Sequence, residues 1–234
     1  MKLLMSLWRG FSYTVGVIVI ALAVYEFWFL AQILYWVDNN PSTTRFMDAR
    51  LETLRHRNPK AQLRNQWVDY HSISIELKRA IIVAEDAKFI DHDGFDWEGI
   101  QRAIEKNQRR GKSVAGGSNI TQQLAKNLFL SGERSAWRKA QEAAITAMLE
   151  AAMGKRRIFE IYLNVAEWGD DVFGAQAAAQ HYFGVNAADL AADQSARLAA
   201  MLPRPRYYDR NRESAYLTSY SEIIFERMPT AQVP

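Results

Sequence analysis

An unbroken apolar stretch near the N-terminus is the clearest pattern along the chain. Between Phe11 and Val37 the only charged residue is Glu26, and Asp38 follows the stretch. Because a helix needs about 20 residues to cross the hydrocarbon core of a bilayer, the pattern predicts a transmembrane or interfacial helix over residues 11–37. A cleaved signal peptide and a buried core helix are the two alternative interpretations.

The residues that flank this stretch predict its orientation. Lys2 and Arg9 precede it, and positive charge before a span favours a cytoplasmic N-terminus. We therefore expect residues 1–10 in the cytoplasm, residues 38–47 as a short polar linker, and residues 48–234 as a folded domain on the other side of the membrane.

Beyond residue 47 the apolar positions recur mostly at helical spacing. A short extended segment is expected at residues 66–70. Serines that precede the periodic segments are expected to cap the helices. The pattern predicts a mainly α fold, with helices over residues 47–56, 74–89, 119–129 and 135–153.

Composition and charge narrow the range of functions by exclusion. Hydrophobic residues make up 49% of the 234-residue chain and aromatic residues 12%, which is enough for a buried core and argues against disorder. The absence of cysteine and the four scattered histidines exclude a disulfide framework and disfavour a zinc site. With 29 Lys and Arg against 26 Asp and Glu, nucleic acid is not an expected partner.

A carboxylate lies at the edge of an apolar helix face. In the predicted 74–89 helix, Leu77 and Ile81 belong to the buried stripe, and Glu85 comes four residues after Ile81. Partial burial raises the pKa of a carboxyl group toward the range useful to a general base. The alternative is that Glu85 and Asp86 form a solvated helix end.

Gly-Gly-Ser at residues 116–118 precedes the predicted 119–129 helix, with Ser118 as its expected cap. Free amides at a helix N-terminus attract anions, phosphates especially, although capped helices without a ligand have the same sequence pattern. Gln123, Lys126 and Asn127 share one polar face of this helix. That face is a candidate surface for a polar ligand.

Basic residues gather around the next predicted helix. Arg134 precedes it, and Arg138 lies four residues before Glu142. One interpretation is a surface ion pair worth a few tenths of a kcal/mol. The other is that Glu142 shares a cleft with Glu85. In that case Lys126, Arg134 and Arg138 form a cationic wall that stabilises a departing diphosphate.

Five segments resemble, in order, the signature motifs of family 51 of the glycosyltransferases, the peptidoglycan glycosyltransferases. Asn119 departs from the threonine that is usual in the second motif. The resemblance covers about residues 66–212, and we expect no transpeptidase domain because the chain ends at Pro234. The segments read EDAKF at 85–89, GGSNITQQLAKN at 116–127, RKAQE at 138–142, KRRIFEIYLN at 155–164 and ARLAAMLP at 196–203.

The resemblance implies a fold similar to lysozyme, with a head lobe and a smaller membrane-facing jaw lobe around a groove. It implies lipid II as the acceptor and a growing lipid-linked glycan as the donor, joined by β-1,4 links with inversion and release of undecaprenyl diphosphate. The enzyme would be a single-pass protein of the bacterial inner membrane with a periplasmic catalytic domain. Membrane lipids and other cell-wall synthesis or division proteins are the further partners implied.

Residue roles follow from the same resemblance, by motif position. Glu85 would be the general base, and Glu142 would assist in the donor site. A divalent cation, Mg or Mn, is the implied cofactor, although no metal-ligand cage is legible in the sequence and no organic cofactor is expected. The residues implied to hold the diphosphate and to position the sugars are Ser118, Gln122, Gln123, Lys126, Asn127, Arg134 and Arg138.

Two functions of other classes stay open at this point. A lysozyme-like lytic enzyme would use a protonated glutamic acid and water to cleave finished peptidoglycan. A membrane-anchored cell-wall scaffold would perform no chemistry and would not need Glu85. Formation of polymer from lipid II separates the first from a transferase, and replacement of Glu85 separates the second.

Overall fold

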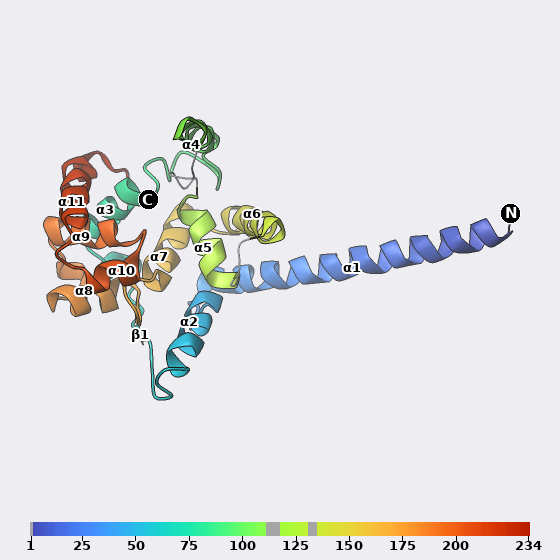
Figure 1. Ribbon diagram of the computed structural model, residues 1–234, viewed down its shortest axis with the longest axis horizontal. Helices are drawn as coiled ribbons and strands as arrows, with labels where there is room; N and C mark the ends of the chain where they lie inside the picture. The colour runs from blue at the N-terminus through green and yellow to red at the C-terminus, as the bar shows by residue number, and fades with distance from the viewer. Residues whose placement is uncertain (1, 111–117, 131–134) are drawn as a thin grey trace. The chain divides into compact units, whose positions relative to one another are not determined.

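The structure, a computed structural model, describes residues 2–110, 118–130 and 135–234 (Figure 1). The chain divides into two units, residues 1–39 and 40–234. The second unit is mainly helical, with a single two-stranded sheet among the described residues, which confirms the predicted fold class; its division into two lobes stays a prediction. Its elements are α2 (Arg45–Arg55), β1 (Arg64–Asn65), η1 (Tyr70–Ser72), α3 (Ile75–Glu85), α4 (Trp97–Arg110), α5 (Ile120–Phe129), α6 (Ala136–Ala152), α7 (Lys155–Val165), β2 (Val172–Phe173), α8 (Ala175–Phe183), η2 (Ala187–Asp189), α9 (Ala192–Met201), α10 (Pro205–Arg210), α11 (Ala215–Arg227) and η3 (Met228–Thr230).

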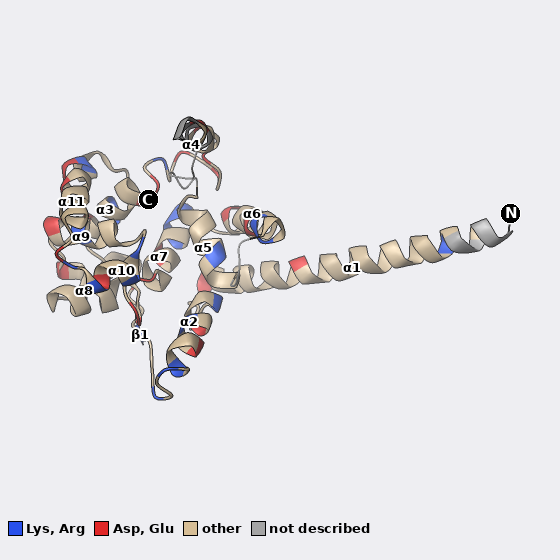
Figure 2. Cartoon of the chain, in the orientation of Figure 1, with Lys and Arg blue, Asp and Glu red and all other residues tan. Residues whose placement is uncertain are grey.

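The first unit consists of one helix, α1 (Lys2–Asp38). Its 31-residue stretch Trp8–Asp38 is long and apolar enough to cross a membrane, by length and composition. Figure 2 shows that charged residues are sparse along α1 and frequent on the helices of the second unit. The predicted apolar helix is therefore confirmed, and it begins well before residue 11 because the preceding residues continue the helix.

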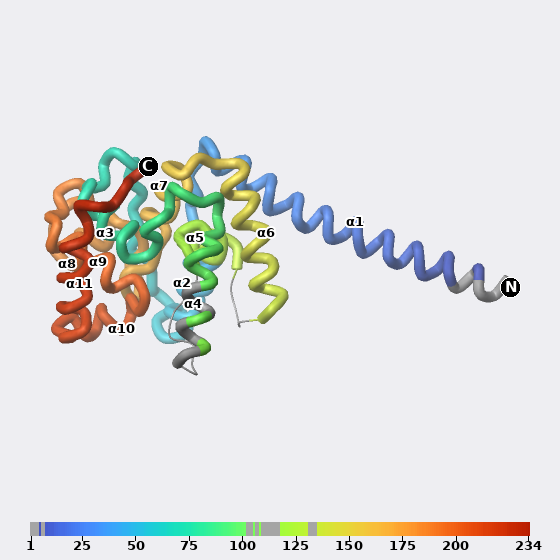
Figure 3. The backbone as a smooth tube through the Cα atoms, turned by 90° about the horizontal axis from the view of Figure 1, so that it is seen from above, coloured from blue at the N-terminus to red at the C-terminus, as the bar shows by residue number. Residues whose placement is uncertain are grey.

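Two groups of helices build the second unit. Helices α3, α9 and α11 pack side by side, as Figures 1 and 3 both show. Leu77 on α3, Leu198 on α9 and Leu217 on α11 are fully buried, so the burial of apolar surface stabilises this group. Helix α5 packs against α2, α6 and α7 and forms the second group.

A minimal sheet connects distant parts of the second unit. Strands β1 and β2 pair in parallel, with Arg64 opposite Val172 and Asn65 opposite Phe173. The segment predicted as extended over residues 66–70 lies just beyond this strand, which ends at Asn65; Asp69 has the extended values φ −64° and ψ 153°, and η1 begins at Tyr70. Beyond Asn65 the side chain of Asn164 takes the place of a partner strand: its Oδ1 accepts from the Val68 N–H at 2.9 Å, and its Nδ2 donates to the Val68 carbonyl at 3.0 Å.

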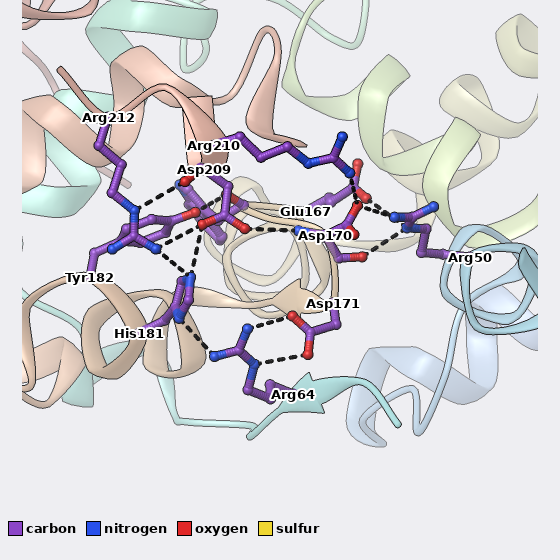
Figure 4. Close-up of polar contacts among 11 residues, drawn as sticks. Arg50, Arg64, Glu167, Asp170, Asp171, His181, Tyr182, Asp209, Arg210 and Arg212 are labelled. Atoms are coloured by element: carbon purple, nitrogen blue, oxygen red, sulfur yellow. Dashed lines mark hydrogen bonds and ion pairs between the residues drawn. The ribbon is translucent and has the colours of Figure 1, made fainter. Parts of the chain in front are cut away.

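Arginines fix the loop between α7 and α8 (Figure 4). Arg50 of α2 donates to the Asp170 carbonyl oxygen at 2.8 Å and forms ion pairs with Asp170 and Glu167. Arg64 of β1 pairs with Asp171. Asp170 and Asp171 lie in the loop between the end of α7 at Val165 and the start of β2 at Val172.

Candidate active site

Helix α3 carries the predicted general base at its C-terminal end. Ser74 caps the helix as predicted, and its Oγ accepts from the Glu76 N–H at 3.2 Å. The helix ends at Glu85 rather than at residue 89, because Asp86 has φ −163° and leaves the helical conformation. Glu85 is thus the last helical residue, with its side chain only partly exposed.

The carboxylate of Glu85 contacts the amide of Gln123 on α5. Gln123 Nε2 donates to Glu85 Oε2 at 2.6 Å. Burial raises the pKa of Glu85, and Asp86 adds to the rise; the hydrogen bond from Gln123 and the charge of Lys126 oppose it without cancelling it. The raised pKa predicted from the sequence is confirmed, and a solvated helix end is excluded.

Asp86 holds the start of α5 beside α3. Its Oδ2 accepts from the Ile120 N–H at 3.3 Å, in the first turn of α5. Both of its oxygens lie 3.1 Å from His92 Nε2. A carboxylate at a helix N-terminus is favourable because the free amides there carry partial positive charge.

The cap of α5 differs from the prediction. Asn119, not Ser118, is the N-cap: its Oδ1 accepts from the Gln122 N–H at 2.9 Å, and Gln122 Oε1 accepts from the Asn119 N–H at 3.2 Å. This capping box occupies one end of the Gln122 side chain. Ser118 is exposed and its Oγ accepts from Lys139 Nζ at 3.4 Å.

Lys126 is the cation that interacts with Glu85, and a second carboxylate and a second cation interact with Lys126. Lys126 on α5 interacts electrostatically with Glu85, Glu142 and Arg138. Burial lowers the pKa of Lys126; Glu142 and Glu85 oppose this shift, whereas Arg138 and Lys139 add to it. Lys126 of α5 thus interacts both with Glu85 of α3 and with Arg138 and Glu142 of α6, and these four residues are called the cluster below.

Within this cluster the pairing on α6 differs from the prediction. Ser135 caps α6 as expected and accepts from the Arg138 N–H at 3.1 Å. Glu142, which is buried, forms its ion pair with Lys139 three residues back, and in the described part of the chain none joins it to Arg138. Arg138 Nε is buried and has no hydrogen-bond partner among the described residues.

The remaining predicted site residues divide into two cases. Asn127 is buried on α5, in the same helix as Gln123 and Lys126. Arg134 and the glycines at 116–117 lie outside the described residues. Among the described residues, no group of three or more histidine, aspartate or glutamate side chains is placed to hold a metal ion, so the divalent cation stays a prediction.

Three polar contacts of the site were missed in the sequence. Asp86 and Lys139 directly follow Glu85 and Arg138 in the sequence, but the residues that they contact are determined by the packing of the helices. Tyr162 on α7, whose Oη donates to Gln123 Oε1 at 3.1 Å, is part of a quoted motif without an assigned role. No spacing rule along one chain predicts a contact between α5 and α7.

The site can perform acid–base chemistry beside a negatively charged group. A partly buried carboxylate with a raised pKa is suited to accept a proton. Partly buried lysine and arginine side chains stabilise negative charge more strongly than exposed ones do, because less water screens them. Glu85 with Lys126 and Arg138 therefore has the composition of a group-transfer site with an anionic leaving group.

The chain is similar to known enzymes of peptidoglycan synthesis. The chain matches the Transglycosylase family over residues 51–229. A biosynthetic peptidoglycan transglycosylase of Nitrosospira multiformis is 56% identical over 227 residues, which are 97% of each chain. Proteins with the same name are 58% identical over 227 residues in Methylobacillus flagellatus, again 97% of each chain, and 60% identical over 211 residues in Dechloromonas aromatica, 90% of this chain and 91% of that one.

The match extends through every described helix of the cluster, since α3, α5 and α6 all lie within the matched residues. It confirms the predicted enzyme class, a glycosyltransferase of peptidoglycan synthesis. The chain belongs to the Transglycosylase family.

Proposed function

We propose that this enzyme polymerises lipid II into β-1,4-linked glycan strands and releases undecaprenyl diphosphate. The observation that supports the proposal most directly is the position of Glu85. Its carboxylate is partly buried, has a raised pKa and interacts with Lys126, which also interacts with Glu142 and Arg138. A base beside fixed cations matches the needs of transfer from a diphosphate.

In the proposed reaction Glu85 removes the proton from the acceptor 4-hydroxyl. The oxygen then attacks the anomeric carbon of the donor sugar, and the bond from that carbon to the diphosphate oxygen breaks with its electron pair. Because attack and departure occur on opposite faces, the configuration inverts. Lys126 and Arg138 stabilise the charge that develops on the diphosphate, and the resemblance adds Arg134 to this set.

Glu142 acts on the cations in this proposal. Its negative charge favours the protonated form of Lys126, which burial disfavours, and Glu142 is itself paired with Lys139. The resemblance implies a divalent cation at this site; Glu142 would be the residue that holds it, and the ion would add positive charge beside the diphosphate.

Replacement of Glu85 tests the function. E85Q keeps the size of the side chain but cannot accept the proton. We expect polymerisation of lipid II, measured with purified full-length protein in detergent, to fall at least ~100-fold, the usual contribution of a general base. E76Q is the matched control, because Glu76 lies on the same helix in an ion pair with Arg79, and it should retain activity within about twofold.

Two results would contradict the proposal. Polymerisation by E85Q within tenfold of wild type would remove Glu85 from the base role and favour a scaffold or another base. Release of soluble sugar fragments from finished peptidoglycan, with no polymer from lipid II, would favour the lytic function.

A further inference from the structure

A buried tyrosine hydroxyl lies directly behind the partner of Glu85. Tyr162 on α7 is 1% exposed. Its Oη is 3.1 Å from Gln123 Oε1, and Gln123 Nε2 is 2.6 Å from Glu85 Oε2. Three side chains from three helices thus form one continuous hydrogen-bond chain that ends on the carboxylate.

The charge of Glu85 determines which groups donate and which accept in this series of hydrogen bonds. An ionised carboxylate only accepts hydrogen bonds, so Gln123 must present its NH₂ group to Glu85. Its carbonyl oxygen then faces Tyr162 and needs a donor, which the phenolic hydroxyl supplies. If Gln123 were flipped, its carbonyl oxygen would face the carboxylate and repel it. Donation by Tyr162 favours the orientation that stabilises the charged base.

We propose that Tyr162 is a positioning residue, which fixes the amide orientation of Gln123 and thereby sets the proton affinity of the catalytic base. The inference rests on the proposed role of Glu85. Among the described residues no hydrogen bond joins Tyr162 to Glu85 directly, so its hydrogen-bonding effect on Glu85 passes through Gln123.

The fold of α7 does not depend on this hydroxyl. The helix is held by the buried side chains of Ile158, Phe159 and Ile161 and by the hydrogen bonds of Asn164 to Val68. Removal of one oxygen atom in Y162F leaves the ring and these contacts in place. The variant is therefore expected to fold.

Other ionisable groups also influence Glu85 and remain unchanged in the variant. Asp86 follows it directly after the end of α3, and its Oδ1 lies 3.1 Å from His92 Nε2. Lys126 of α5 and Tyr220 of α11 interact electrostatically with Glu85. Because their charges are the same in wild type and Y162F, a difference between the two pH profiles reports the hydrogen-bond chain.

The decisive measurement is kcat/KM for lipid II polymerisation between pH 5 and 9, which reports the ionisation of the free enzyme. Loss of the Tyr162 hydrogen bond weakens stabilisation of ionised Glu85, so its pKa rises and the acidic limb of the profile moves to higher pH. We expect a shift of about half to one pH unit, a three- to tenfold lower rate on that limb. The rate on the alkaline plateau should stay within about twofold.

Two further variants isolate the path of the effect. Q123M removes the amide and should shift the acidic limb at least as far as Y162F. The double variant Y162F/Q123M should shift it no further than Q123M alone, because Tyr162 acts through Gln123. Y182F is the matched control: Tyr182 Oη also donates one hydrogen bond, to the Trp168 carbonyl at 2.6 Å, and its profile should overlay that of wild type.

The outcomes separate the inference from the function on which it rests. A Y162F profile that overlays wild type, or one lowered equally at every pH, overturns the positioning role while an inactive E85Q keeps the base assignment. Additive shifts in the double variant also overturn it. Full activity of E85Q would instead remove the base assignment itself.

Discussion

Glu167 is a buried carboxyl group outside the active site with an unusual pKa. It lies between Arg206, at 3.6 Å, and Arg50, at 3.7 Å. Burial raises its pKa to about 7, and the two arginines only partly oppose the shift. Neither contact is a close hydrogen bond, so the protonated form is favoured in the folded protein well above the pH at which an exposed glutamate ionises.

This shift predicts a pH-dependent stability. The pKa in the folded state lies above the unfolded value, so the contribution of Glu167 is fully present below about pH 4 and is lost as the pH rises through about 7. E167Q should therefore be more stable than wild type at pH 8, by on the order of 2 kcal/mol, and should differ little at pH 4.

Urea unfolding of the full-length protein in detergent at both pH values checks this prediction. E52Q, an exposed position on α2, is the control and should leave the pH dependence unchanged. Equal destabilisation of E167Q at pH 4 and pH 8 would show that the arginine pairs dominate.

At the scale of single residues, the sequence predicted those properties that depend only on a residue's position on its own helix. The raised pKa of Glu85 was predicted from its place beside the stripe of Leu77 and Ile81. The partner of Glu142 was not, because Lys139 and Arg138 lie three and four residues before it and both spacings bring side chains together on a helix. Packing of α6 in the fold decides between them.

At the scale of elements the start of α5 connects the site to the fold. Asn119 caps the helix, and its Nδ2 donates to the Gly94 carbonyl at 2.7 Å. Gly94 has φ +82°, and a Cβ there would lie 2.8 Å from Thr146 of α6. One side chain therefore links α5 to the turn that follows Asp86.

We expect N119A to lower the free energy of unfolding by about 1–2 kcal/mol, since it removes the cap and leaves a buried carbonyl without its donor. N119T retains a capping oxygen and should lose less. S135A is the control, because Ser135 caps α6 at an exposed position. A loss for N119A no larger than that for S135A in thermal unfolding would contradict the prediction.

Each helix predicted by residue range is present, whereas its ends depended on local competition; α4 and α7–α11 had not been predicted by range. Ser74 and Ser135 are caps as expected, but at residues 118–119 two good capping residues are adjacent. The glutamine at 122 identifies the correct one, because a capping box places glutamine three residues after the cap. Strand β1 has two residues and is too short for any periodic pattern.

At the scale of the whole molecule the family was recognisable from five ordered motifs, and the apolar helix from length alone. The lobes and the orientation in the membrane were implied only by resemblance. Packing between helices far apart in the chain, such as α3 with α9 and α11, has no signal in a single sequence.

Orientation is tested by protease added to intact spheroplasts. Lys2 and Arg9 before the span predict a cytoplasmic N-terminus, so the protease should degrade residues 40–234 and leave a fragment about as long as α1. Protection of the whole chain until lysis would reverse the orientation. A mature protein that lacks the first residues and leaves the membrane fraction would support a cleaved signal peptide.

The pairing of β1 with β2 determines when the second unit is completed during synthesis. Arg64 meets Val172, and α3 needs α9 and α11 to cover its apolar face, so the early segments emerge long before their partners exist. Contacts between residues far apart in sequence form slowly and leave apolar surface uncovered meanwhile. The second unit is therefore expected to stay incompletely folded, with apolar surface uncovered, until α11 has been synthesised.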